Sequence, residues 1–285
     1  MLMVVVEFLK KGFFCFLTGI ILSRVSAKAA DSAESPFLRG EWLEYQVYYS
    51  GLIQAGTATM HVDEQLHHLN EHLCYKVQVE GVSSSALEFL GFKVSDRWES
   101  YLDVDGSNAL RPYRCVTLLQ ENGYVREEQV DFDYQAYQAR VEVAESTRNM
   151  ECEVAHHAIP STKSIKDLIG GYYALRSIDA TKLKPGDKLT LTVLHDQQIY
   201  ENVVILFLGK KTIPTKLGKT SALVFVPSIP GEYSIFSGER PVEVYVSDDV
   251  NKVPLKLKVN LVVGSVEIEL KAYKGLKAPI HFQPS

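Results

Sequence analysis

The chain has 285 residues, 46% of them hydrophobic and 23% charged, and a formal net charge of −5 at pH 7. This composition excludes a disordered polymer, and the length permits one large β domain or two small ones, with apolar residues for a sizeable core. Nucleic acid is not an expected partner, because a moderately acidic chain without a basic run cannot neutralise phosphates.

The first 29 residues are typical of a secretory signal peptide. Two lysines precede the apolar run Gly12–Leu22, and Ala27-Lys28-Ala29 provides a cleavage site between small residues. Because spanning a bilayer takes roughly 20 apolar residues, a retained anchor is the weaker alternative. Lipidation at Cys15 is also less favoured, since no small residues flank it. We therefore predict a periplasmic protein, cleaved near Ala29, whose mature chain has no transmembrane span.

The mature chain is more acidic than the precursor. Removal of residues 1–29 takes away four basic residues and one acidic residue, which leaves a formal net charge of −8. Three cysteines remain, Cys74, Cys115 and Cys152, and an oxidising compartment would permit one disulfide with one thiol left over. None belongs to a Cys-x-x-Cys pair, so neither a zinc site nor a redox site is expected. Buried free thiols are the simpler prediction.

Alternation of apolar and polar residues recurs along the mature chain, as in strands with one buried face and one wet face. It is clear in Leu43–Tyr49 and Tyr75–Val79, and further runs lie between turn sequences such as Glu121-Asn122-Gly123 and Pro185-Gly186-Asp187. About a dozen short strands predict a mainly all-β fold. We expect an antiparallel meander that forms a barrel or a strongly curved sheet.

Four histidines, His61, His67, His68 and His72, cluster between two of these runs. On a helix, the i, i+4 spacing of His68 and His72 would give a metal-binding pair. The segment lacks a sustained helical pattern, so we predict a polar hairpin loop and no metal site.

The next predicted strand, Ser95–Asp103, carries charges beside aromatic residues. Alternation places Asp96 and Trp98 on one face, with Arg97, Glu99 and Tyr101 on the other. These five side chains are the candidate ligand-binding residues, and the alternative is a salt-bridged strand that fixes the register of the sheet. The carboxylates of Asp96 and Glu99 point to opposite faces, so catalysis by this pair is not expected, and no catalytic residue is assigned.

Arg97 is predicted to be largely buried, paired with Glu99 and directed into the concave side of the sheet. The apolar segment Ser85–Val94 leads directly into the charges, which suggests a strand committed to the interior. Interior charge is tolerated only when it is paired.

The period changes in "STKSIKDLIGGYYALRSID", where Ile165, Leu168, Ile169, Tyr172, Leu175 and Ile178 follow helical spacing. We predict a helix near residues 164–178, with Ser161, Thr162 or Ser164 as the cap. Gly170 and Gly171 weaken this helix by roughly 1 kcal/mol each relative to alanine, so it should depend on packing against the sheet. The helical segment 161–180 would join two β halves or plug an open end.

Four stretches resemble one known family: "GEWLEYQVYYSGLIQAGTATMHV" from Gly40, "SDRWESYLD" from Ser95, "LIGGYYALRSID" followed by "LKPGDKLTL", and "EVYVSDDVNKVPLKLKVNLVVGSVEIELKAY" near the C-terminus. In this order they are similar to the bacterial exported family DUF3108. The resemblance implies a single secreted or periplasmic β domain over residues 30–285. It supplies no activity and no catalytic residues. The family usually has Tyr in place of Trp98, and polar or small residues in place of Gly170-Gly171.

The chain lacks a Gly-x-Ser-x-Gly elbow, a phosphate-binding glycine loop, a His-Glu-x-x-His motif and a dinucleotide fingerprint. Common enzyme classes and cofactors are therefore not expected. The leading hypothesis is a non-enzymatic periplasmic binding or chaperone-like protein for an amphipathic envelope ligand, either a lipid or a glycan. One alternative is an envelope assembly or structural protein that binds a protein partner along a sheet edge. A less favoured one is a hydrolase or lyase that uses acidic residues.

Overall fold

The computed structural model describes residues 35–104, 110–146, 150–158, 165–195, 197–228 and 236–284. The predicted signal peptide, with its cleavage site and Cys15, lies outside these ranges. Within them the chain forms one antiparallel sheet of fourteen strands. The strands are β1 (Trp42–Tyr49), β2 (Ile53–Leu69), β3 (His72–Ser83), β4 (Ser95–Asp103), β5 (Pro112–Glu121), β6 (Tyr124–Asp133), β7 (Gln138–Ser146), β8 (Met150–Ala158), β9 (Lys188–His195), β10 (Gln198–Thr215), β11 (Gly218–Pro227), β12 (Val242–Ser247), β13 (Pro254–Asn260) and β14 (Ser265–Lys274).

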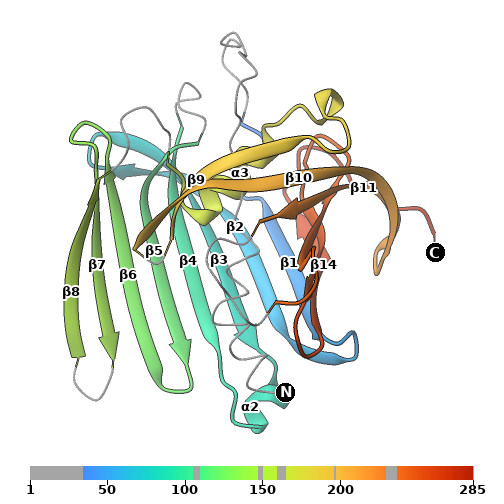
Figure 1. Ribbon diagram of the computed structural model, residues 1–285, viewed down its shortest axis with the longest axis horizontal. Helices are drawn as coiled ribbons and strands as arrows, with labels where there is room; N and C mark the ends of the chain where they lie inside the picture. Colours follow the sequence, from blue (N-terminus) through green and yellow to red (C-terminus); the bar gives the residue numbers. More distant parts are fainter. Residues whose placement is uncertain are drawn as a thin grey trace.

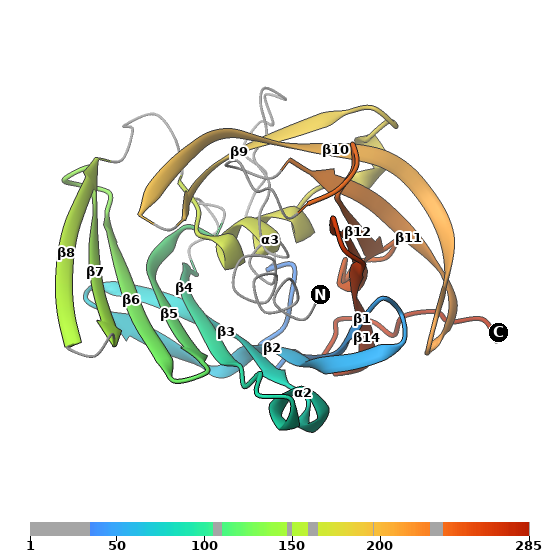
Figure 2. The same cartoon turned by 60° about the horizontal axis from the view of Figure 1, so that its bottom comes forward.

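The sheet order is β8-β7-β6-β5-β4-β3-β2-β1-β14-β13-β12-β11-β10-β9. The strands are thus two meanders, β1–β8 and β9–β14, joined where β1 pairs with β14. The predicted antiparallel meander is confirmed. Among the described strands, β8 and β9 are the two edges and do not pair with each other, so the sheet is strongly curved rather than a closed barrel. Figures 1 and 2 show it curling around the helix α3 (Leu168–Arg176).

The main core lies on the concave face of the sheet, on the side of α3. On the central strand β1, Leu43, Tyr45 and Val47 are 0–2% exposed, and they pack with buried residues of β3, β14 and α3. The intervening Glu44 and Tyr48 are only half-buried. The alternation in the sequence therefore corresponds to an inner face that packs and an outer face in contact with water.

The predicted helix exists, but it begins later than its hydrophobic periodicity suggests. Lys166 forms a parallel β-bridge with Val193 of β9, which holds the preceding residues extended. Asp167 is the N-cap, and its Oδ1 accepts a hydrogen bond from Gly170 N at 2.7 Å. The caps predicted from the sequence, Ser161, Thr162 and Ser164, lie outside the described residues. A tertiary contact with β9 thus sets the start of α3.

Gly170 allows α3 to approach the sheet closely. A Cβ atom at this position would lie 2.6 Å from Asp167 Oδ1 and 3.1 Å from Leu102 Cδ2 of β4. Gly170 lowers the helical propensity of α3, but it allows the helix to pack closely against the sheet. The helix contacts both β4 and β9, so it connects the two meanders through the interior.

Two local predictions were wrong. Part of the segment expected to be an interior strand, Ser85–Val94, forms the short helix α2 (Ser85–Phe89), because Ser84 Oγ caps it by accepting from Leu87 N at 3.4 Å. The histidine-rich segment is strand rather than loop, since β2 continues to Leu69 and β3 begins at His72. A tight turn at Asn70, with φ of 54°, leaves no room for a longer loop.

The cysteines agree with the simpler prediction as far as they are described. Cys74 and Cys115 are free thiols, and burial raises the pKa of Cys74 to about 12. Cys152 lies on β8, and its side chain is not among those that the structure describes. These two buried or half-buried thiols are therefore poor nucleophiles at neutral pH.

A buried ion pair fixes the C-terminal end of α3. Arg176 and Glu41, just before β1, are each 1% exposed. The guanidinium makes a fork-shaped contact with the carboxylate: Nη1 donates to Oε1, and Nη2 donates to Oε2 at 2.7 Å. Arg176 Nε donates to Asn251 O at 2.7 Å, and the guanidinium lies 5.2 Å from the ring centroid of Tyr173. Every face of this cation is thus occupied.

We expect Arg176→Ala to lower the free energy of unfolding by roughly 3–5 kcal/mol, because it leaves the Glu41 carboxylate buried and unpaired. Urea unfolding followed by circular dichroism measures the loss. The double variant Arg176→Met, Glu41→Leu removes both charges and should recover most of the stability. A single-variant loss of less than about 1 kcal/mol would contradict a structural role for this pair.

Candidate functional site

The five residues predicted to line a ligand site lie on opposite faces of β4. Asp96 and Trp98 are buried on the concave side, where Trp98 pairs with Val79 of β3. Arg97, Glu99 and Tyr101 are on the outer face. The fold therefore does not bring the five side chains into one site.

The prediction that Arg97 is buried on the concave side was wrong. Its side chain is 44% exposed, and its Nε lies 3.4 Å from Glu99 Oε1. Glu99 is the buried member and also pairs with Lys76, whose Nζ lies 3.0 Å from Oε2. The prediction that Arg97 pairs with Glu99 was thus right, but the predicted face of β4 was wrong. The apolar residues before β4 form α2, and the core packs against Trp98 on the other face. Tyr101 OH completes the cluster by donating to Glu99 Oε2 at 3.5 Å.

The concave pair, Asp96 and Trp98, lines a small hollow together with two glycines, Gly56 and Gly81. Asp96 Oδ1 accepts a hydrogen bond from Gln120 N at 3.0 Å. The hollow measures about 270 Å³, including space open to solvent. Its single carboxylate cannot provide the two converging groups of an acid/base pair.

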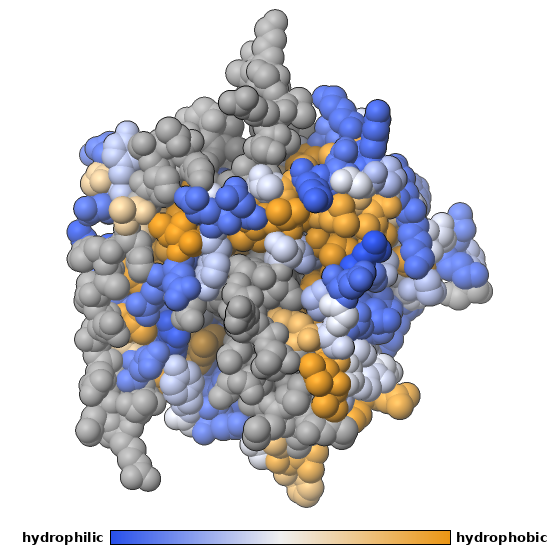
Figure 3. Space-filling view, viewed as in Figure 1, coloured by the Kyte–Doolittle hydropathy of each residue, from blue (hydrophilic) through white to orange (hydrophobic). Residues whose placement is uncertain are grey.

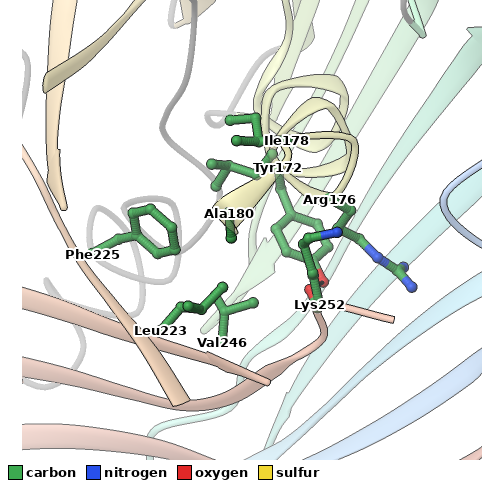
Figure 4. Close-up of a pocket in the computed structure, with 9 residues that line it drawn as sticks. Tyr172, Arg176, Ile178, Ala180, Leu223, Phe225, Val246 and Lys252 are labelled. Carbon is green, nitrogen blue, oxygen red and sulfur yellow. Dashed lines mark hydrogen bonds between the residues drawn. The ribbon is translucent and has the colours of Figure 1, made fainter. Parts of the chain in front are cut away.

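A second hollow, between α3 and strands β11 and β12, is the stronger candidate. Its walls are apolar, with one phenol and two cationic side chains at the α3 side (Figure 4). It measures about 280 Å³, including space open to solvent. The lining residues are Tyr172, Leu175, Arg176, Ile178, Ala180, Leu223, Phe225, Val246 and Lys252. We name this hollow the α3 pocket.

The two cations of the α3 pocket differ in their partners. In Figure 4 the guanidinium of Arg176 points away from the hollow, toward Glu41, which neutralises it. Lys252 is half-buried, and among the described residues no carboxylate lies within ion-pair distance of its Nζ. Burial and the nearby charge of Arg176 lower the pKa of Lys252. An ammonium in this setting is stabilised by an anion.

The backbone of Lys252 is held firmly in the turn between β12 and β13. Its N–H donates to Asp249 Oδ1 at 3.1 Å, and its carbonyl accepts from Tyr172 OH at 3.4 Å. Its φ is 47°, a left-handed conformation that non-glycine residues adopt rarely. The turn thus fixes the start of the side chain, while the ammonium remains available. No pattern in the sequence indicates that Lys252 meets α3.

A separate polar cluster surrounds the start of α3. Lys166 and Asp167 are nearly inaccessible to solvent, and Lys166 Nζ donates to Leu110 O at 3.0 Å. Burial lowers the pKa of Lys166 to about 8 and raises the pKa of Asp167 to about 6, although Gly170 N donates a hydrogen bond to the Asp167 carboxylate. These groups stabilise the cap and the β-bridge. Because they are inaccessible, we treat them as structural.

The described residues hold no metal-ligand cluster: nowhere within them do three His, Cys, Asp or Glu side chains gather suitably. His67 contacts Asp63 instead, with Nε2 2.9 Å from Oδ2. Neither hollow contains two carboxylates. In the part of the chain that is described, no helix has the length and apolar character needed to cross a membrane.

Comparison with known proteins identifies a family but no activity. A family model described as "Protein of unknown function (DUF3108)" matches residues 44–271. No curated protein matches the chain.

Several solved structures are similar in outline. A β-barrel-like protein with a domain of unknown function, DUF1849, from Brucella abortus is 9% identical, with a TM-score of 0.47, and the match covers 84% of this chain and 98% of that one. A Bacteroides fragilis protein provisionally described as exported, with a YmcC-like fold, is 10% identical over 84% and 98%, with a TM-score of 0.33. A Parabacteroides distasonis protein provisionally described as a lipoprotein is 10% identical over 86% and 100%, with a TM-score of 0.31.

We expect Arg97→Ala to lower the free energy of unfolding by only about 0–1 kcal/mol, because the Arg97 side chain is exposed to solvent and Glu99 keeps its pair with Lys76. Glu99→Ala should cost more, since it leaves Lys76 half-buried without its carboxylate. Denaturant unfolding of both variants tests this ranking. An Arg97→Ala loss of 3 kcal/mol or more would restore the original prediction of a buried arginine.

We also expect the stability to depend on pH through Asp167. Its folded pKa of about 6 lies above the unfolded value of 3.8, so the folded state binds the proton more tightly. The resulting stability is fully present below about pH 4 and is lost as the pH rises through about 6. Asp167→Asn keeps an acceptor for Gly170 N and should be more stable than the wild type at pH 7, by on the order of 1–3 kcal/mol.

Urea unfolding at pH 4, 5, 6 and 7 measures this difference, which should shrink toward pH 4. Asp179→Asn is the control, because hydrogen bonds from Thr181 and Lys182 lower the pKa of Asp179 to about 2. The folded and the unfolded pKa of Asp179 both lie below this range, so Asp179→Asn should leave the shape of the pH profile almost unchanged. Parallel profiles for the wild type and Asp167→Asn would contradict the assignment.

Proposed function

The chain belongs to the DUF3108 family, and we propose that it is an exported, non-enzymatic binding protein of the bacterial envelope whose ligand is an anionic amphipathic molecule. The observation that carries this proposal is the α3 pocket. Among its described lining residues, Lys252 is the one cation that has no carboxylate partner. Export to the periplasm with cleavage near Ala29, and one domain over residues 30–285, are parts of the same proposal.

The chemistry of the pocket favours a ligand with a small anionic head and an apolar stem. Lys252 would hold a phosphate or carboxylate by a charge-assisted hydrogen bond. Leu223 and Phe225 of β11 and Val246 of β12 offer an apolar wall for the first methylene groups. The remainder of a longer chain would continue outside the hollow. A neutral glycan fits less well, because the walls provide few hydrogen-bonding groups.

Arg176 supports the site without contacting the ligand. Glu41, Asn251 and Pro36 accept four hydrogen bonds from its guanidinium, which has five N–H donors, and the guanidinium points away from the hollow (Figure 4). Its positive charge still raises the electrostatic potential in the pocket and lowers the pKa of Lys252. The resulting site binds an anion through one movable ammonium and does no covalent chemistry.

A second candidate function, assembly with another envelope protein, is favoured by one feature of the sheet. Strand β8 (Met150–Ala158) pairs with β7 on one side, and no described strand pairs with its other side. An unpaired strand edge accepts an extended segment of a partner. Photo-crosslinking in cells from a position on β8 tests this role, and the absence of a reproducible crosslinked partner would count against it.

We expect Lys252→Gln to weaken the binding of decyl phosphate roughly tenfold or more, because a charge-assisted hydrogen bond contributes about 1.5–3 kcal/mol. Isothermal titration calorimetry below the critical micelle concentration measures the affinity. Lys277→Gln is the matched control, since Lys277 is near enough to lower the pKa of Lys252 but is not in the pocket. It should change the affinity by less than about threefold.

Decyl maltoside, which has the same chain and no charge, should bind weakly and show no difference between the variants. Ala180→Phe fills the pocket and should remove decyl phosphate binding without altering the charge. Equal affinities of Lys252→Gln and Lys277→Gln for decyl phosphate, or a wild type that does not bind it, would refute the proposed function.

A further inference from the structure

The exposed apolar residues gather at one end of the molecule. Among the described residues, seven of the eleven exposed large hydrophobic side chains lie on three segments: the β1–β2 turn, α2 with the end of β3, and the β13–β14 turn. Phe89 is 91% exposed and Leu52 is 90% exposed. The set is Leu52, Ile53, Val82, Phe89, Leu90, Val262 and Val263. We name it the apolar end. In Figure 3 orange patches mark the lower edge, where Figure 1 places α2 and the β1–β2 turn.

Hydrogen bonds join the three segments into one surface. Ser84 Oγ, at the cap of α2, donates to Gln54 O of β2 at 2.8 Å. Tyr49 OH, at the end of β1, donates to Val263 O at 2.8 Å, and Ser50 N donates to Ser265 O at 2.7 Å. The exposed side chains therefore project from a rigid base. They are not scattered single residues of the kind that every protein surface carries.

Several backbone groups at these tips are already hydrogen-bonded within the protein. Leu52 N donates to Tyr49 O, Leu90 N to Leu87 O, and Leu261 N to Gly264 O, at 3.0–3.2 Å. A segment that enters the apolar boundary of a bilayer must satisfy its backbone internally, because little water is available there. A tip of this kind can thus enter lipid at low cost.

The distribution of charge fits the surface of an anionic bilayer. The tip sequences Ser50–Ile53, Phe89–Phe92 and Leu261–Gly264 contain no charged residue. Lys93 follows directly and is exposed. Glu88 on α2 is also exposed, but its Oε1 accepts from Ser83 Oγ at 3.3 Å, on the side of the sheet. Apolar side chains with a lysine at their boundary are the pattern of interfacial membrane anchors.

We propose that the apolar end docks this protein on a lipid bilayer that contains anionic headgroups. Phe89, Leu90 and Leu52 enter the boundary between headgroups and acyl chains, and Lys93 contacts lipid phosphate. A bilayer is favoured over a protein partner because the most exposed side chains protrude as adjacent pairs from hairpin and helix tips. A protein interface would instead present a packed apolar centre with a polar rim.

This inference is independent of the α3 pocket. Glu41 is bound to Arg176 at the start of β1, whereas Tyr49 contacts the β13–β14 turn at the end of the same strand. The two sites are therefore separated by roughly the 25 Å length of an eight-residue strand. Variants of one site should leave the other intact. The bilayer and the soluble amphiphile can be tested separately.

Vesicle flotation of the purified mature protein tests the proposal. The vesicles are phosphatidylethanolamine with phosphatidylglycerol, or phosphatidylcholine alone. We expect the wild type to float with the anionic vesicles, and Leu52→Ser, Phe89→Ser to reduce the bound fraction at least tenfold. Both side chains are almost fully exposed, so the double variant should keep the wild-type unfolding midpoint. Lys93→Gln should reduce binding to anionic vesicles and leave the weaker binding to phosphatidylcholine unchanged.

The matched control is Val250→Ser. Val250 is an apolar residue with 58% exposure on the turn that carries Lys252, at the other end of the molecule. This control and Lys252→Gln should both float like the wild type. A wild type that floats with neither vesicle, or a Leu52→Ser, Phe89→Ser variant that floats equally well, overturns the proposal. A wild type that forms a dimer, which the double variant dissociates without any change in flotation, overturns it in favour of a second copy as the occupant.

Discussion

The ion pair between Arg176 and Glu41 is the interaction on which the arrangement of this protein depends. The sheet has two edges in β8 and β9, and α3 follows β8 and precedes β9 in the chain. Strand pairing therefore does not place the helix; its side chains do. Charge burial is expensive, and here it is offset by a fork-shaped contact and by an additional backbone acceptor, Asn251 O. Together with the β-bridge of Lys166 at the opposite end, this contact keeps α3 inside the curve of the sheet.

The character of the α3 pocket follows from the same contact. A helix inserted against β11 and β12 brings Tyr172 and Ile178 opposite Leu223 and Phe225, and the hollow between them is apolar. Glu41 neutralises one of the two nearby cations, so the pocket has one ammonium to offer rather than a saturated ion network. The strands then separate this end from the apolar end, where hairpin tips and α2 expose side chains that nothing described covers. One curved sheet thus carries two surfaces of different chemistry: the α3 pocket, which accepts an anion, and the apolar end, which suits a lipid surface.

Patterns in the sequence predicted the structure correctly wherever they are local. Leu43, Tyr45 and Val47 alternate and are buried, the period-3.6 segment is α3, and the quoted stretches indicated the family. The predictions failed where the position of a side chain depends on which other segment packs against it. Arg97 was placed on the concave side because apolar residues precede it, yet those residues form α2 and the core lies on the Trp98 side. A strand has two faces, and alternation alone does not say which one packs.

The sequence by itself determined the β class, the meander, one interior helix and membership of a family without a known activity. These properties depend on hydrophobic periods and turn residues, which act over a few neighbouring positions. Only the tertiary structure decided that Arg176 meets Glu41 across 135 positions, that Lys252 faces α3, and that Leu52, Phe89 and Val262 share one end. Contacts between distant positions are set by how the sheet curls and by which side chains fill its interior, and no local pattern in a single sequence encodes that geometry.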